Sequence, residues 1–149
     1  MMHLGYTPYI IPMLVAAVIS AALAAYVWRR RSTAPGATAL ALLMLALTGW
    51  LLAEVLCLVN NDLSARLIWA KVEYIGIVSV PVLLLAFVLQ YTGQQKWLTC
   101  RHLALLAICP IITLLLTWTN EAHSLIWTNF SIHQSGSVML SEKTYGVWF

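Results

Sequence analysis

Residues 37–59 read ATALALLMLALTGWLLAEVLCLV, an apolar run that a single charged residue, Glu54, interrupts. As a helix rising 1.5 Å per residue, a run of this length crosses a hydrocarbon core of about 30 Å. Lipid offers the backbone no hydrogen-bond partner, so a spanning segment must satisfy its own peptide groups, which a helix does. The run is therefore predicted to cross a membrane as a helix.

Three more apolar runs have similar length and fall at residues 8–28, 69–91 and 103–119; Lys71 and Glu73 lie near the start of the second of these. Ser32 to Gly36, Asn60 to Asp62 and Thr92 to Gln95 supply the turn residues that separate the four runs. The fold class predicted from this pattern is an all-α membrane protein with four transmembrane helices in an up-down bundle.

Composition excludes the other broad classes of protein. Of the 149 residues, 62% are apolar and 9% are charged, with a mean hydropathy of +0.86. Soluble domains average about 45–50% apolar and about 25% charged residues, so this chain has too little polar surface for a water-facing globule. Disordered chains are poor in aliphatic and aromatic residues, and that class is excluded too.

Basic residues indicate the orientation, because Lys and Arg concentrate in cytoplasmic loops. With the N-terminus outside, the inner loops receive Arg29, Arg30, Arg31, Lys96 and Arg101, and the outer side receives Arg66, Lys71 and Lys143. The N-terminus is therefore predicted outside the cell membrane. Four spans then place residues 120–149 outside as well, where loose alternation around Ser135, Gly136 and Ser137 favours a short β-hairpin.

Glu54 is the sharpest candidate site residue, because an ionisable group within a span needs a partner and marks a functional site by default. If the second and third spans form a hairpin turning near Asp62, Glu54 lies level with Lys71, and Trp50 level with Tyr74. An ion pair between Glu54 and Lys71 is predicted. Two interpretations are open. The charges hold the helices in register, or they line an outward-facing ligand or proton site.

Two further groups of candidates lie near the same end. Trp69 and Glu73 share the face of the third span opposite Lys71. If residues 118–127 are helical, Asn120, His123 and Trp127 fall on one face, as a site for a small molecule or a proton, or as an interfacial cap. The nine ligand-sensing candidates are Trp50, Glu54, Trp69, Lys71, Glu73, Tyr74, Asn120, His123 and Trp127.

No catalytic residue, metal site or cofactor is expected. Cys57, Cys100 and Cys109 lack metal-ligand spacing, and one histidine without a second ligand does not bind a metal. Arg29, Arg30 and Arg31 account for the net charge of +3 as a topology signal, so nucleic acid is not an expected partner. The expected partners are membrane lipid and a small-molecule or membrane-borne signal.

The sequence resembles the N-terminal seven-transmembrane (7TM) sensor region of histidine kinases, a region also found ahead of diguanylate cyclases. The matching residues are Trp50 and Glu54; Trp69 to Gly76; Pro81, Phe87, Gln90, Tyr91, Thr92 and Gly93; Trp97 and Pro110; Thr119, Asn120, His123 and Trp127; and Tyr145, Gly146, Trp148 and Phe149.

The resemblance implies a sensory input module of a bacterial or archaeal signal-transduction protein in the plasma membrane, working as a homodimer in its full-length form. The chain covers about the first four helices of that region and is interpreted as truncated before its output domain. Kinase or cyclase activity is not expected, since no Gly-rich nucleotide-binding segment is seen. The alternative is a small four-helix transporter in which Glu54 exchanges protons with a cationic substrate.

The predicted orientation is testable by cysteine labelling after the three native cysteines are replaced by alanine. Single cysteines at Ser32 and Gln95 should react only with a membrane-permeant maleimide, and one at Ser64 should also react with an impermeant reagent, because only that turn faces outward. Impermeant labelling at Ser32 or Gln95 in intact cells would show that the topology is inverted.

Overall fold

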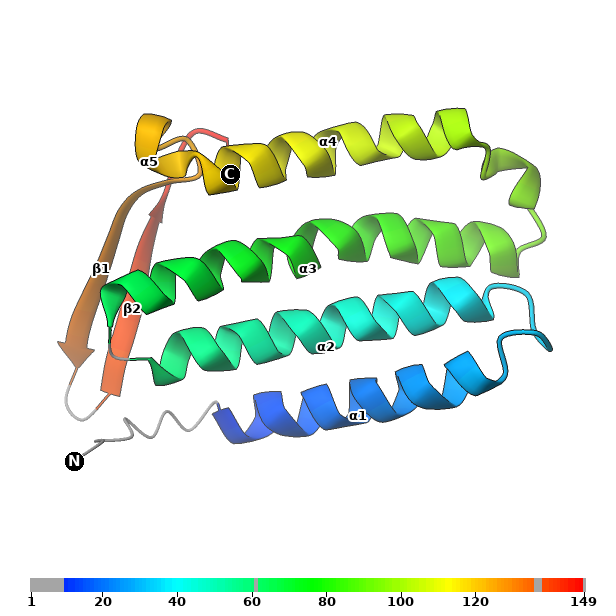
Figure 1. Cartoon of the computed structure of the whole chain (residues 1–149), viewed down its shortest axis with the longest axis horizontal. Helices are drawn as coiled ribbons and strands as arrows, with labels where there is room; N and C mark the ends of the chain where they lie inside the picture. The colour runs from blue at the N-terminus through cyan, green and yellow to red at the C-terminus, as the bar shows by residue number, and fades with distance from the viewer. Residues whose placement is uncertain (1–9, 61, 136–137, 149) are drawn as a thin grey trace.

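The computed structural model describes residues 10–60, 62–135 and 138–148 (Figure 1). Its elements are α1 (Ile10–Arg29), α2 (Ala37–Val59), α3 (Leu63–Tyr91), the short 3-10 helix η1 (Gln95–Trp97), α4 (Cys100–Trp118), α5 (Asn120–His123), β1 (Trp127–Ser135) and β2 (Val138–Tyr145). The helices α1 to α4 are each long and apolar enough to cross a membrane, so the predicted four spans are found.

The four long helices run alternately up and down and lie in a row in chain order (Figure 1). The main contacts among the described helices join chain neighbours: α1 with α2, α2 with α3, and α3 with α4. The row is therefore open, rather than a bundle in which α4 returns to pack on α1. Large apolar side chains are exposed on all four long helices.

Small residues form the helix contacts, and large aliphatic residues point outward. Ala24, Ala41 and Ala70 are buried, whereas Val18 is 68% exposed and Leu105 is 64% exposed. Helices associate in lipid without a hydrophobic driving force between them, so close backbone approach at small residues supplies the packing energy. This distribution suits a hydrocarbon environment.

Gly76 of α3 allows the backbones of α2 and α3 to come into close contact. A Cβ atom built on Gly76 would lie 2.6 Å from Trp50 Cβ, 3.1 Å from Trp50 Cα and 3.2 Å from the Ala46 carbonyl oxygen. All three atoms belong to the α2 backbone or lie next to it, so no side-chain rotation can make room. Gly76 therefore fixes how deeply α2 and α3 interlock.

The turn between α2 and α3 is capped from both sides. Asp62 is the N-cap of α3: its carboxylate accepts from Ala65 N at 3.2 Å and from the Ser64 hydroxyl. These bonds lower the pKa of Asp62, the Ser64 bond most, so the cap is strongest with the carboxyl ionised and weakens as the pH falls through that lowered pKa.

Arg66 explains why α3 begins at Leu63, six residues before the predicted span. Its buried guanidinium donates to the carbonyl oxygens of Asn60 and, at 3.3 Å, Leu58, at the C-terminal end of α2. A cation at that end satisfies carbonyls without intrahelical partners and complements the helix dipole. The first turns of α3 are thus helical although they carry a charge.

Beyond α4 the chain turns through α5 into two antiparallel strands, with Trp127 opposite Tyr145 and Ser135 opposite Val138. They occupy the segment where the sequence favours a hairpin; its residues 136 and 137 lie outside the described part of the chain, as do residues 8 and 9 of the first predicted span. In Figure 1 the strands lie across the end of the row where α2 ends and α3 begins.

Replacing Gly76 by alanine should destabilise the protein by about 1–3 kcal/mol, because the added methyl group forces α2 and α3 apart. Gly49→Ala is the matched control: its Cβ would meet nothing within 4 Å, so only helix propensity changes and stability should rise or stay the same. Thermal unfolding in detergent measures both. Equal midpoints for the two variants would contradict the proposed close packing.

Candidate functional site

An acidic recess, defined by Trp50, Glu54 and Glu73, lies between α2 and α3. Trp50 Nε1 donates a hydrogen bond to Glu73 Oε1 at 3.2 Å, and Glu73 is 7% exposed. Glu54 follows Trp50 by one helical turn on α2 and is half-buried. The structure thus brings together an indole and a carboxylate from neighbouring spans, at the level where the sequence matched Trp50 with Tyr74.

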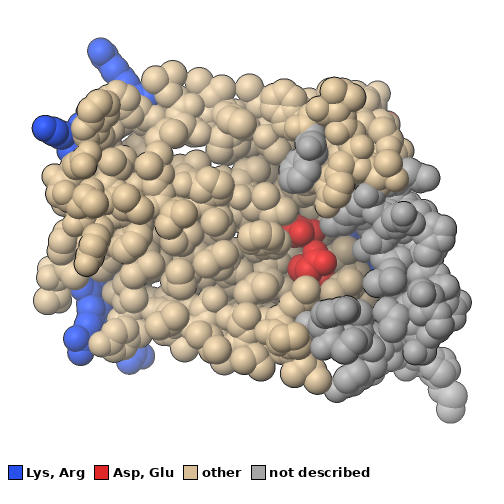
Figure 2. Space-filling view, turned by 180° about the vertical axis from the view of Figure 1, so that it is seen from behind, with Lys and Arg blue, Asp and Glu red and all other residues tan. Residues whose placement is uncertain are grey.

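Figure 2 shows acidic side chains, in red, in a hollow of one face of the molecule. Lys and Arg side chains in this view project mainly from the opposite end of the row. A carboxylate within a span attracts protons or cationic groups, because lipid cannot solvate its charge. The recess is therefore suited chemically to a proton or a cationic ligand.

Lys71 pairs with Glu121 and not, as the sequence predicted, with Glu54. Its Nζ lies 2.8 Å from Glu121 Oε1 on α5 and 3.5 Å from the Trp118 carbonyl oxygen, so it faces α4 rather than α2. Equal depth is not sufficient for pairing, because the two side chains must also face one another around their helices. Glu121 is 76% exposed, which makes this a surface pair of small energetic value.

Tyr74 and Trp127 form the centre of a small apolar core beneath the strands. Both are buried, and their ring centroids lie 5.6 Å apart at an interplanar angle of 55°. Ile126 is buried with them, and Leu114 and Leu116 of α4 pack against this cluster. This cluster therefore connects the start of β1 to both α3 and α4.

Asn120 anchors the turn between α5 and β1. Its Oδ1 accepts from Ile126 N at 2.8 Å and Trp127 N at 3.3 Å, while its Nδ2 donates to the Trp127 carbonyl oxygen at 2.9 Å. Asn120 is 3% exposed, so these bonds satisfy an amide that would otherwise be buried at a cost. Its position is that of a structural latch.

The proposed helical face of Asn120, His123 and Trp127 is wrong. α5 ends at His123, Ser124 has a φ of 52° in the left-handed region, and Trp127 already belongs to β1. Asn120 and Trp127 do meet, but through the latch and not through helical spacing.

His123 holds the same turn from its exposed side. Leu125 N donates to Nδ1 at 3.1 Å, so Nδ1 is an acceptor and the neutral ring carries its proton on Nε2. Nε2 lies 3.0 Å from Thr119 Oγ1, whose own hydroxyl donates to the Leu115 carbonyl oxygen at 2.7 Å. These hydrogen bonds connect the end of α4 to Leu125, which directly precedes Ile126 of the apolar core.

The remaining candidate, Trp69, is half-buried on α3. Two contacts were missed by sequence reasoning. Glu121 could have been found as the acidic residue that follows the fourth span, level with Lys71. Trp148 Nε1 donates to Thr113 Oγ1 on α4 at 3.2 Å, a contact that no local sequence pattern signals. The described residues contain no cluster of three metal-ligating side chains.

Comparison with known proteins identifies one family. The family model described as the N-terminal 7TM region of histidine kinase matches residues 12–149, which include all but the first two residues of α1, the whole of α2 to α4 and both strands. No curated protein and no solved structure matches the chain.

Replacing Asn120 by alanine should loosen the turn into β1, because it leaves the Ile126 amide and the Trp127 carbonyl buried without these partners, at a cost of about 1–3 kcal/mol. Hydrogen exchange at Ile126 and Trp127 should accelerate about tenfold or more.

Asn60→Ala is the matched control, since it removes an exposed amide bond to the Leu56 carbonyl oxygen. It should leave exchange at Ile126 and Trp127 unchanged. Unchanged exchange in the Asn120 variant would show that the latch does not hold the strand.

Proposed function

We propose, because the chain belongs to the family of N-terminal 7TM regions of histidine kinases, that it works as the membrane sensory input module of a bacterial or archaeal signal-transduction protein. The observation that carries the proposal is the family match over residues 12–149 together with four helices of membrane-spanning length and composition. The family is a sensor input region and not a catalytic domain, so signalling output belongs to other parts of such a protein.

The module is proposed to sit in the plasma membrane with its N-terminus outside. The loops that carry Arg29 to Arg31, Lys96 and Arg101 then face the cytoplasm, as the excess of basic residues requires. In a region of seven spans this orientation brings the end of the last span into the cytoplasm. That is the compartment in which an ATP-dependent output works.

The signal-responsive surface is proposed to be the outer half of the row. The acidic recess places two membrane carboxylates beside an indole. Residues 40–47, in the other half of α2, are almost purely aliphatic and offer only nonspecific packing. A cationic or protonatable group on a small molecule or a membrane-borne signal complements this recess. Its binding would act on α2 and α3 together, because both helices line it.

The signal is proposed to pass from α3 to α4 through the core cluster of Tyr74, Ile126 and Trp127. Tyr74 lies next to Glu73 on α3 and packs on Trp127, and residues of α4 pack against the cluster that contains both rings. A change at the recess that rotates or shifts α3 therefore moves the strands and α4 with it. The exposed apolar faces of the open row leave area for a second copy, as a homodimeric sensor needs.

A chimera tests this function: the seven-span region joined to a reporter kinase, with phosphorylation measured in membrane vesicles. Glu54→Gln and Glu73→Gln should each change basal output about fivefold or more, because neutralising a membrane carboxylate alters the energy difference between the two signalling states. His123→Ala tests the turn between α5 and β1 in the same assay.

Glu121→Gln is the matched control, because it removes the same charge from an exposed surface pair. It should leave output unchanged. Unaltered output in both recess variants, at equal expression and insertion, would mean that Glu54 and Glu73 are structural only.

A further inference from the structure

An apolar cleft runs between α3 and α4. It lies in the half of the row that ends at Arg29 to Arg31, Lys96 and Arg101, which we call the basic half. One section, of about 370 Å³, is lined by Leu85, Leu89, Gln94, Trp97, His102, Leu105 and Leu106. A second section, of about 410 Å³, shares Leu85 and Leu106 with the first and continues along α3 and α4 to Thr113. The shared residues make the two sections one continuous cleft.

The length of the cleft corresponds to one leaflet of a bilayer. His102 and Thr113 mark its two ends on α4, and eleven residues at 1.5 Å each span about 17 Å. Half of a hydrocarbon core of about 30 Å is about 15 Å. A single acyl chain that enters from the basic end would therefore fill the cleft and end near the middle of the membrane.

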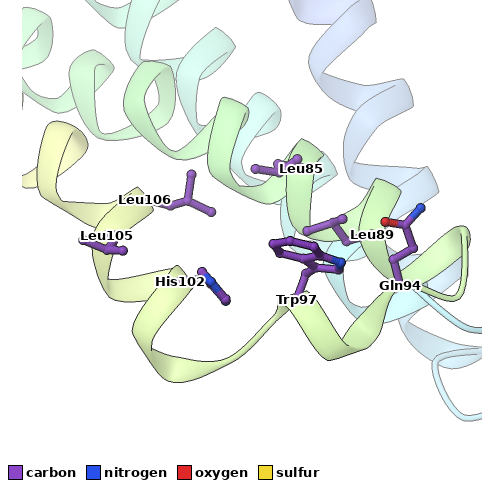
Figure 3. A pocket seen from close by; sticks show the side chains of 7 residues that line it. All are labelled: Leu85, Leu89, Gln94, Trp97, His102, Leu105 and Leu106. Atoms are coloured by element: carbon purple, nitrogen blue, oxygen red, sulfur yellow. The ribbon is translucent and has the colours of Figure 1, made fainter.

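The mouth of the cleft differs chemically from its walls. Figure 3 shows Leu85 and Leu89 of α3 facing Leu106 of α4, with the Trp97 ring and His102 at one end of the gap. The two rings lie 5.6 Å apart, centroid to centroid, and Thr99 Oγ1 lies 2.8 Å from His102 Nδ1. None of the hydrogen bonds among the described residues uses His102 Nε2. An indole and an imidazole at the membrane surface suit the glycerol and headgroup region of a lipid.

Charge at the mouth favours an anionic headgroup. Lys96 and Arg101 are exposed and directly precede Trp97 and His102 in the chain. The sequence contains no acidic residue between Glu73 and Glu121, so nothing within that segment neutralises them. Basic pockets between membrane helices at this level bind anionic lipid headgroups.

We propose that the α3–α4 cleft is a binding site for one anionic phospholipid. One acyl chain lies between Leu85, Leu89 and Leu106, and the phosphate lies against His102, Lys96 and Arg101. The site is at the end of the row opposite the acidic recess, and it does not depend on which signal the recess detects.

Native mass spectrometry of the purified protein in detergent tests the site, with dioleoyl phosphatidylglycerol and dioleoyl phosphatidylcholine as probes of equal chain length. The protein should retain one phosphatidylglycerol per chain in preference to phosphatidylcholine. Replacing Lys96 and Arg101 by glutamine should reduce phosphatidylglycerol affinity about fivefold for each residue, and bring the two lipids close together. Arg29→Gln with Arg30→Gln removes the same charge from the same end and should leave the preference intact.

The acyl chain is tested separately by filling the cleft. Leu106→Trp should abolish retention of both lipids, whereas Ile108→Trp, on the same helix but outside the cleft, should not. Three results overturn the proposal: equal loss of preference in the Arg29 and Arg30 variant, undiminished lipid retention in a folded Leu106→Trp variant, or a wild-type dimer that retains no lipid, which would mean a second copy covers the cleft.

Discussion

The close contact of α2 and α3 at Gly76 is the interaction on which the rest of the structure depends. In hydrocarbon the helices gain nothing by hiding leucine from solvent, so they are held where small residues let their backbones meet. Gly76 brings the α3 backbone against Trp50 and Ala46, and this contact sets both the depth and the rotation of α3. Glu73, one turn away, then reaches the Trp50 indole, and the neighbouring Tyr74 reaches Trp127.

Much of this arrangement follows from the sequence, because lipid imposes simple rules. Apolar runs of about 20 residues must be helices to cross lipid, and the short turn at Asp62 fixes which residues of α2 and α3 lie at one depth. That Trp50 and Tyr74 lie at the same depth was predictable for that reason. The early start of α3 was not, because the rule treats Arg66 as the end of a span, while its guanidinium is buried among the carbonyl groups that close α2.

The contacts outside the spans were less predictable, because backbone turns decide them rather than periodicity. Depth alone paired Lys71 with Glu54, but the side of α3 that Lys71 occupies faces α4, where Glu121 is available. Asn120 and Trp127 were grouped by helical spacing; they meet because Ser124 adopts a left-handed conformation and reverses the chain. A reversal at a residue other than glycine has no strong sequence signal, so the latch could be seen only in the structure.

The packing between α3 and α4 changes along the length of the two helices. Near the strands the helices are joined through Tyr74, Trp127 and Leu114, and Trp148 holds α4 at Thr113. From Thr113 toward the basic end the same two helices part around the cleft.

Thr113 thus belongs both to the contacts near the strands and to the end of the cleft that is nearest the strands, so one position of α4 serves both. Coupling between two binding sites is reciprocal in free energy. If filling the cleft shifts α4 at the strands, a ligand that binds beside Tyr74 must therefore change the affinity of the cleft by the same factor.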